Sequence, residues 1–296
     1  MKIAKIIATS FYFSEHREET TLAGNPPTYS FHSQKFLKTD DVKNLIMFQI
    51  EQEKKCNPGF PVDLIFVNND VGNKEGNKFI QNLNNYKFNN GKVITIQNDN
   101  FGWSFGAYNK GYKELRNLYD YFIFTEHDVI ISRDGYAKKS LDDFKKNKNC
   151  GFISYWGISY YDGYPRHINK DDYTHAKGAS GFTSNEVLDK VFQKYGSLPY
   201  SKSSEKKDYR KIIEDGEIKF TNVIIKLGYK LYESSEKTFD SAYDLMRGIK
   251  KPWKPSQYEL LKWNLKKNIR KKCYNILIFF GLHIYYKKLR KKLFKF

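Results

Sequence analysis

Cysteines are few in this sequence and long apolar runs are missing, and both absences narrow what the protein can be. Its three cysteines, Cys56, Cys150 and Cys273, are odd in number and far apart, so neither a disulfide framework nor a cysteine metal site is expected. Cysteines used in this way suit a reducing compartment. No apolar run reaches the ~20 residues that a membrane-spanning helix needs. Residues 1–10 have the pattern of a strand rather than of a signal peptide, so we expect a cytoplasmic protein.

Internal repeats and low-complexity segments are also missing, and acidic residues are missing from the C-terminal end. Twelve of the 51 Lys and Arg residues lie between Lys262 and Phe296, where there is no Asp or Glu. About two thirds of the net charge of +18 therefore belongs to this end rather than to the whole fold. The rest of the 296 residues, rich in aromatic side chains, can form one large domain. We predict a catalytic domain over 1–245 and a basic tail over 246–296.

Short apolar runs alternate with helical patterns along the first half of the chain. The predicted strands cover residues 2–9, 62–67, 92–97, 121–125 and 151–155. The predicted helices cover 41–55, 74–85 and 134–146, and a further helix, with Asn109 and Lys110 in its first turns, ends at about Leu118. This alternation predicts an α/β fold, a Rossmann-like and mostly parallel sheet flanked by helices. In the less regular second half we predict helices over 185–195 and 218–227, a strand over 229–232 and a loop of small residues over 177–182.

An acidic triplet, Glu126, His127 and Asp128, follows the run Tyr121–Thr125, which is apolar or aromatic on both faces. Such a run is typical of a strand in the middle of a sheet. Carboxylates next to a buried strand are costly unless a positive group meets them, and open α/β sheets bind ligands at the carboxyl ends of strands. We interpret the triplet as a metal or substrate site, with His127 packing into the fold. The alternative is a polar turn between two strands.

Several segments taken together resemble the GT-A glycosyltransferases, close to the inverting family 2. The first strand would enter the nucleotide site, and the second ends in Asn-Asn-Asp at 68–70, where the family places an acid near the base and ribose. Residues 100–111 are similar to the family's N-x-G…A-x-N-x-G helix, and the triplet stands where the family has its DxD motif. The acid Glu217, followed by a helix and Gly-Tyr-Lys-Leu at 228–231, resembles the one that ends the family's acceptor site.

The resemblance covers about residues 1–235 and departs from the family pattern at two places. The triplet begins with Glu instead of Asp, and Glu214, Asp215 and Glu217 compete for the position of the catalytic base. The resemblance implies a GT-A fold and metal-dependent, inverting transfer of a hexose from a nucleotide sugar, a UDP-sugar, to a hydroxyl of a glycan or lipid-linked glycan. The process would be bacterial surface polysaccharide or lipopolysaccharide synthesis.

The same resemblance assigns roles to individual residues. Asp128 would bind Mn²⁺ or Mg²⁺ directly and Glu126 directly or through water, because these ions prefer oxygen ligands and commonly use one or two carboxylates plus phosphate. The expected donor-binding residues are Thr9, Phe11, Asp70, Asp99, Gly106, Asn109, Lys110 and Glu126. Several have a plainer alternative: core packing for Phe11, a turn acid for Asp70, a helix cap or turn for Asp99, a solvated helix lysine for Lys110 and a surface acid for Glu126.

An inverting reaction needs a general base that deprotonates the acceptor hydroxyl. Glu217 is the first candidate for this base and Asp215 the second. Both stand where a helix is predicted to begin, so the alternative is an acid stabilised by the helix dipole.

The C-terminal tail has an apolar, aromatic segment between two basic ones. Residues 273–286 are apolar and aromatic, and basic clusters flank them at 266–272 and 287–292. This pattern favours an amphipathic helix over 256–296 that lies on an anionic membrane surface, which would place the enzyme on the cytoplasmic face of the inner membrane. The alternatives are a helix docked on the domain and a nucleic-acid-binding tail.

The rival hypothesis for the whole chain is a non-catalytic basic adaptor that binds membrane or nucleic acid on an α/β fold. Segregation of the charge into the tail and the lack of an RNA-binding aromatic motif favour the enzyme, and no nucleic-acid partner is expected.

Overall fold

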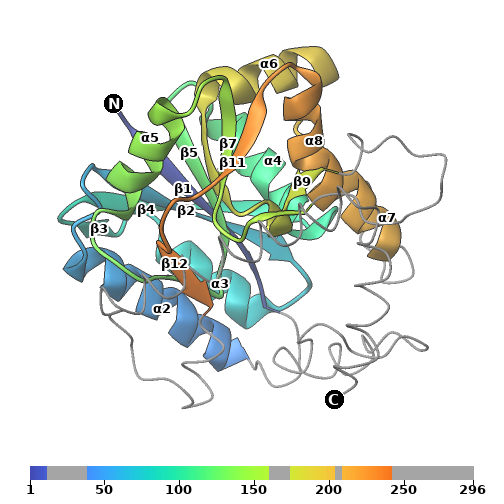
Figure 1. Cartoon of the computed structure of the whole chain (residues 1–296). Helices are drawn as coiled ribbons and strands as arrows, with labels where there is room; N and C mark the ends of the chain where they lie inside the picture. Colours follow the sequence, from blue (N-terminus) through green and yellow to red (C-terminus); the bar gives the residue numbers. More distant parts are fainter. Residues whose placement is uncertain (12–38, 160–173, 204–208, 242–296) are drawn as a thin grey trace, which may run out of the picture.

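The computed structural model describes residues 1–11, 39–159, 174–203 and 209–241 (Figure 1). The predicted tail and its helix lie outside these ranges. The described part confirms the predicted fold class, because a large and mostly parallel sheet is flanked by helices on both faces. None of the described helices combines the length and the apolar character that crossing a membrane would require.

The main sheet has eight strands, and β5 lies next to β1 near its middle. Its spatial order is β11 (Lys230–Glu233), β7 (Cys150–Ser154), β10 (Gly181–Ser184), β5 (Tyr121–Glu126), β1 (Ile3–Ser10), β2 (Val62–Asp70), β4 (Gly91–Asp99) and β3 (Lys87–Phe88). The pairs β5–β1, β1–β2, β2–β4 and β7–β11 are parallel. The short strands β10 and β3 run antiparallel to their neighbours. The carboxyl ends of β1, β2, β4 and β5 therefore meet at one edge of the sheet.

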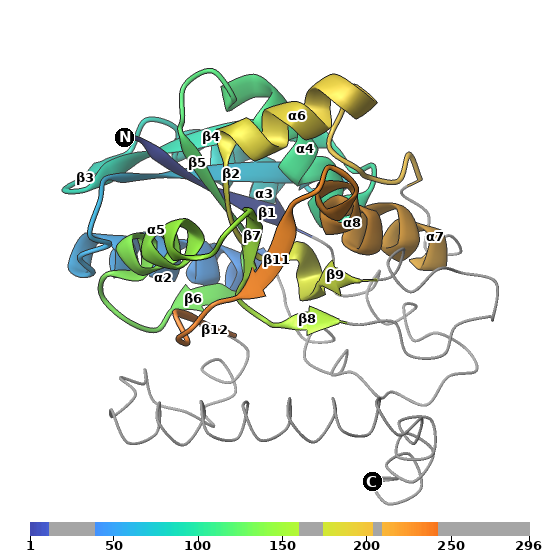
Figure 2. The ribbon, with the colours of Figure 1, turned by 45° about the horizontal axis from the view of Figure 1, so that its top comes forward.

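Helices cover the two faces of this sheet, as the two views in Figures 1 and 2 show. One face carries α2 (Thr39–Lys55), α3 (Lys74–Asn82) and α5 (Tyr136–Lys146), and the other carries α4 (Trp103–Leu115), α6 (Asn185–Tyr195) and α8 (Lys219–Lys226). Alternation along β1 explains the division, since Ile7 packs with α2 and α3 whereas Ile6 packs with α4.

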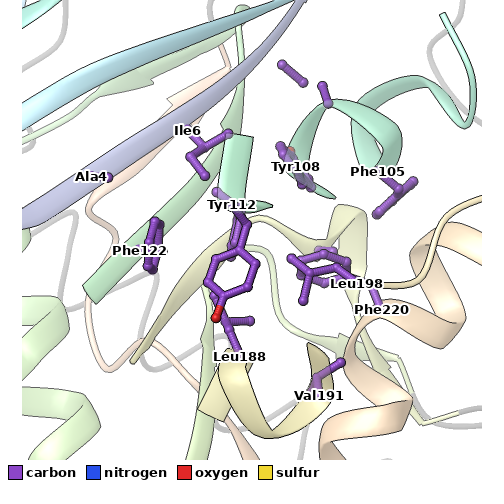
Figure 3. Packing of buried hydrophobic residues seen from close by; sticks show 14 of the residues in the cluster. Ala4, Ile6, Phe105, Tyr108, Tyr112, Phe122, Leu188, Val191, Leu198 and Phe220 are labelled. Atoms are coloured by element: carbon purple, nitrogen blue, oxygen red, sulfur yellow. The ribbon is translucent and has the colours of Figure 1, made fainter. Parts of the chain in front are cut away.

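Aromatic side chains dominate the core beneath α4, α6 and α8. In Figure 3, Tyr112 of α4 lies beside Phe122 of β5 and near Leu188 of α6, whereas Tyr108, one turn earlier in α4, lies towards Phe105 and Phe220. The rings of Tyr108 and Phe220 meet edge to face with their centroids 5.8 Å apart. This packing joins α4 and α8, the two helices that flank the carboxyl end of β5.

Smaller elements surround the main sheet. Strand β6 (Val129–Ile131) pairs with β12 (Phe239–Ser241), and β8 (Ile158–Ser159) pairs with β9 (His175–Ala176). A 3₁₀ turn, η3 (Lys177–Ala179), precedes β10, and α7 (Tyr209–Ile213) runs into the π-helical turn η5 (Glu214–Ile218), which leads into α8.

The structure differs from the sequence predictions in two segments. The predicted loop at 177–182 holds η3 and the start of β10, which lies inside the sheet between β5 and β7. A Cβ on Gly181 would lie 2.2 Å from the carbonyl oxygen of Ile153, so only glycine fits this close approach. The predicted helix over 218–227 is preceded by the π-helical turn η5.

A charged pair is buried on the α2 and α5 face of the sheet. Lys5 of β1 and Glu53 of α2 are fully buried, and Nζ of Lys5 lies 3.2 Å from Oε1 of Glu53. The hydroxyl of Tyr136 donates to both oxygens of Glu53, at 2.8 and 3.0 Å. Nζ of Lys5 also lies 5.2 Å from the ring centroid of Phe239. Each buried charge thus has partners, which offsets its loss of hydration.

Candidate functional site

Three carboxylates gather at the carboxyl end of β5. Glu126 is the last residue of β5, Asp128 follows in the turn before β6, and Glu217 comes from η5. Burial and the negative charges of Asp128 and Glu217 together raise the pKa of Glu126 to about 7, although a hydrogen bond from Ser104 opposes them. Like charges this close favour either a shared proton or a bound cation.

Ser104 in the first turn of α4 holds Glu126 in place. Its hydroxyl donates to Oε1 of Glu126 at 2.6 Å. The start of α4 is fixed in turn by strand ends, because Nδ2 of Asn69 donates to the carbonyl of Trp103 at 3.0 Å and Nδ2 of Asn98 donates to Asn69 at 2.7 Å. The motif at 100–111 therefore contributes Ser104, a hydrogen-bond donor to the carboxylate of Glu126. The sequence pattern gave no sign of this role.

Asp128 is suited to meet a cation. Its Oδ1 atom is buried and accepts no hydrogen bond from any described residue, and no Lys or Arg within the described ranges forms an ion pair with it. A buried carboxylate oxygen without a partner is costly, so a positive ligand would stabilise it. His127, predicted to pack into the fold, is buried beside β1 with Nδ1 3.4 Å from the carbonyl oxygen of Ala8.

The side chain of Glu217 is oriented by the segment before β10. The backbone N–H of Gly178 donates to Oε1 of Glu217 at 2.7 Å, and Nε2 of His175 lies 3.8 Å from the same oxygen. Gly216 allows η5 to pack closely against α4, since a Cβ there would lie 2.4 Å from the ring of Phe105. Turns of the π type are frequent at functional sites, where they redirect a side chain.

The hydroxyl of Tyr108 completes the cluster. Burial raises the pKa of Tyr108 well above its ordinary value, and the charges of Glu126, Asp128 and Glu217 raise it further. Tyr108 therefore stays protonated, in a buried position where the charges of all three carboxylates act on it. Sequence reasoning missed Tyr108, because an aromatic residue inside a helix gives no signal of a polar role.

Asp215, the second candidate for the base, has different neighbours from Glu217. It forms an ion pair with Lys219 one turn further along the chain, and it lines a pocket that Glu217 does not line. Of the two candidates, Glu217 is the one whose charge acts on Glu126.

The predicted donor residues of β1 and β2 lie at or near the carboxyl ends of these strands. Thr9 is buried and donates to the carbonyl of Ile7, and Phe11 is buried against Phe79 in the α2 and α3 core. Asp70 is exposed and accepts from the side chain of Asn77 and the backbone N–H of Gly72, two hydrogen bonds that lower its pKa.

The other predicted donor residues lie on β4 and α4. Asp99 ends β4 in register with Asp70 and is exposed. A Cβ on Gly106 would lie 1.7 Å from the carbonyl oxygen of Phe101, so glycine is required there. Asn109 accepts from the backbone N–H of Leu198 at 2.9 Å. Lys110 forms an ion pair with Glu114 at 2.7 Å, an arrangement that matches the solvated-lysine alternative.

Comparison with known proteins adds little to this geometry. No protein-family model matches the sequence, and no curated protein matches it. The chain is similar to a solved structure, 4-diphosphocytidyl-2C-methyl-D-erythritol synthase from Anaerococcus prevotii DSM 20548, with 11% identity and a TM-score of 0.37. The match covers 90% of this chain and 98% of that chain. At this level of similarity nothing is transferred from the neighbour, and the site is interpreted from its own residues.

The raised pKa of Glu126 predicts a pH-dependent stability in the absence of metal. The fold favours the protonated carboxyl, so this contribution is complete below pH ~4.5 and is lost as the pH rises through about 7. Glu126→Gln stays neutral and does not lose it. In urea titrations with EDTA, we expect the free energy of unfolding of the wild type to fall relative to this variant by about 2 kcal/mol between pH 5 and 8. Parallel pH profiles would contradict the assignment.

Proposed function

We propose that the protein is a metal-dependent glycosyltransferase that moves a hexose from a nucleotide sugar to a hydroxyl of a glycan or lipid-linked glycan. The observation that supports this best is the cluster of Glu126, Asp128 and Glu217 at the carboxyl edge of a Rossmann-like sheet. The resemblance to GT-A glycosyltransferases of family 2 adds the UDP-sugar donor, inversion at the sugar carbon, and a place in bacterial surface polysaccharide synthesis.

The residues at the edge of β5 fit a divalent cation. Among the described residues no three His, Cys, Asp or Glu side chains are placed to hold a metal ion together. In this proposal the protein therefore supplies two carboxylates and the donor's phosphates supply the other ligands, as is common for Mg²⁺. Mn²⁺ or Mg²⁺ would be held by Asp128, whose Oδ1 lacks a hydrogen bond, and by Glu126. Such an ion, when bound, neutralises the negative charge of the departing diphosphate.

In the proposed mechanism Glu217 removes the proton from the acceptor hydroxyl. One of its oxygens is fixed by the N–H of Gly178, which leaves the other to face the acceptor. Ser104 orients Glu126, and the protonated hydroxyl of Tyr108 would be available as a hydrogen-bond donor near the carboxylates. Packing of the π-turn against Phe105 would keep the base at a constant distance from the carboxylates of β5.

A thermal-shift screen of nucleotide sugars tests the proposal directly. We expect UDP-sugars to raise the melting temperature with Mn²⁺ or Mg²⁺ present and to have no effect in EDTA. Release of UDP, measured with the same sugars, would follow the metal. The proposal is wrong if no nucleotide sugar stabilises the protein with either metal. Binding of RNA or DNA with a steep dependence on salt would instead support the adaptor.

We also propose that residues 256–296 attach the enzyme to an anionic membrane. In the full-length chain, replacing the five Lys and Arg residues within 287–292 by Gln should weaken binding to phosphatidylserine vesicles at least tenfold, because each such charge contributes about 1 kcal/mol before screening. Vesicle sedimentation measures this, and phosphatidylcholine vesicles are the control. Nucleotide-sugar binding should be unchanged. Equal sedimentation of variant and wild type on phosphatidylserine would exclude this role of the basic cluster.

A further inference from the structure

A pocket lies against the helical stretch that includes the π-turn η5. Its volume is about 320 Å³, and its walls come from the segment after α6 and from the helical stretch that includes η5. The residues that matter here are Pro199, Tyr200, Lys202, Lys211, Asp215 and Lys219. None of the proposed metal ligands lines it, and the base candidate Glu217 does not line it either.

The charge of this pocket is positive. Lys202 and Lys211 are exposed and form no ion pair within the described part of the chain, whereas Lys219 is paired with Asp215. Three lysines and one aspartate give the lining a formal charge of +2. Lysine ammonium groups around a concave surface attract phosphate or carboxylate oxygens, because hydrogen bonds between charged partners are about twice as strong as neutral ones.

The walls of the pocket are fastened to the carboxylate site. Asn109 of α4 accepts from the N–H of Leu198 at 2.9 Å, and the N–H of Gly102 donates to the carbonyl of Ser203 at 3.0 Å. Gly102 is two residues before Ser104, the partner of Glu126. On the opposite wall, Asp215 and Glu217 belong to the same π-turn. The pocket and the proposed base are therefore connected through η5, in which Asp215 lines the pocket two residues before Glu217.

We propose that this pocket binds an anionic group of the acceptor, a phosphate or a carboxylate, while the reacting hydroxyl lies near Glu217. That the bound molecule is the sugar acceptor rests on the proposed function, whereas the affinity of the pocket for anions rests on its own lysines. Lys202 and Lys211 supply the attraction, and the partly buried ring of Tyr200 supplies a flat surface against which a sugar packs. The enzyme would then prefer acidic acceptors over neutral ones.

Binding of small acidic sugars to the full-length protein in EDTA tests this inference. Glucose 1-phosphate, glucuronate and glucose would be titrated by calorimetry against the wild type and against the double variant Lys202→Gln, Lys211→Gln. We expect one of the acidic sugars to bind the wild type at least tenfold more tightly than glucose, and the double variant to lose this preference. The acidic sugar that binds more tightly identifies the group as phosphate or carboxylate.

A control with the same change in charge separates the pocket from general electrostatics. Lys87 and Lys145 are exposed, lie on β3 and α5, and form no ion pair within the described ranges, so Lys87→Gln, Lys145→Gln should keep the preference for acidic sugars. Equal affinities of the wild type and the Lys202, Lys211 variant would overturn the inference. The proposed function is measured separately by Mn²⁺-dependent binding of UDP-sugars, which the pocket variant should retain.

Discussion

Asp128→Asn should abolish metal-dependent binding of UDP-sugars and lower sugar transfer by about 1,000-fold or more. The buried Oδ1 of Asp128 has no hydrogen-bond partner among the described residues, and an amide at this position removes the charge that would hold the cation. Loss of one charge-stabilising group from a water-poor site commonly costs 10²–10³ in rate, and here the metal is lost with it. Calorimetry with Mn²⁺ and UDP, followed by a transfer assay, measures both effects.

The matched control for this substitution is Asp142→Asn. Asp142 is exposed on α5 and pairs with Lys138 on the surface, so the same change of chemistry there should leave binding and transfer within twofold of the wild type. Circular dichroism of both variants checks the fold. Wild-type affinity for Mn²⁺ and UDP in Asp128→Asn would rule out Asp128 as a metal ligand.

Glu217→Gln should lower the rate of transfer by about 10²–10⁴ while the affinity for the donor changes little. A general base contributes this much, and the amide keeps the shape of the side chain and its acceptor for the N–H of Gly178. Steady-state kinetics should show the loss in kcat.

Two comparisons make the Glu217 result decisive. Glu186→Gln changes an exposed residue of α6 that pairs with Lys190, and transfer should be unaffected. Asp215→Asn tests the other candidate: a larger loss of rate in this variant than in Glu217→Gln would move the base to Asp215. Unchanged kcat in both variants would show that neither residue is the base.

The sequence pattern predicted the parallel strands of the sheet well, because a strand that is buried on both faces is apolar on both faces. The run Tyr121–Thr125 is apolar on both faces, and the structure places it in the middle of the sheet between two layers of helices. Helix α6 occupies the predicted range 185–195, where Ser184 accepts a hydrogen bond from the N–H of Val187 as its N-cap. Long periodic segments and local caps are the features that a single sequence shows most directly.

The rest of the site depended on contacts between distant segments, which no local pattern reports. Strand β10 has four residues, and Gly181 is there because a carbonyl of β7 approaches closely. Ser104 and Tyr108 were not singled out because their roles depend on Glu126, at another place in the chain. The π-turn at Glu217 has the composition of an ordinary helix start, so the sequence left three acids competing for one role.

The buried pair of Lys5 and Glu53 has a consequence for how this protein can evolve. Loss of either residue alone would strand an uncompensated charge inside the fold, a defect of about 3–5 kcal/mol, whereas exchange of both for apolar residues can be neutral. Tyr136 shares the constraint, since its hydroxyl would lose its acceptor. Related chains should therefore keep Lys5, Glu53 and Tyr136 together or replace all three. A related sequence that lacks one of them should also carry a substitution at one of the other two.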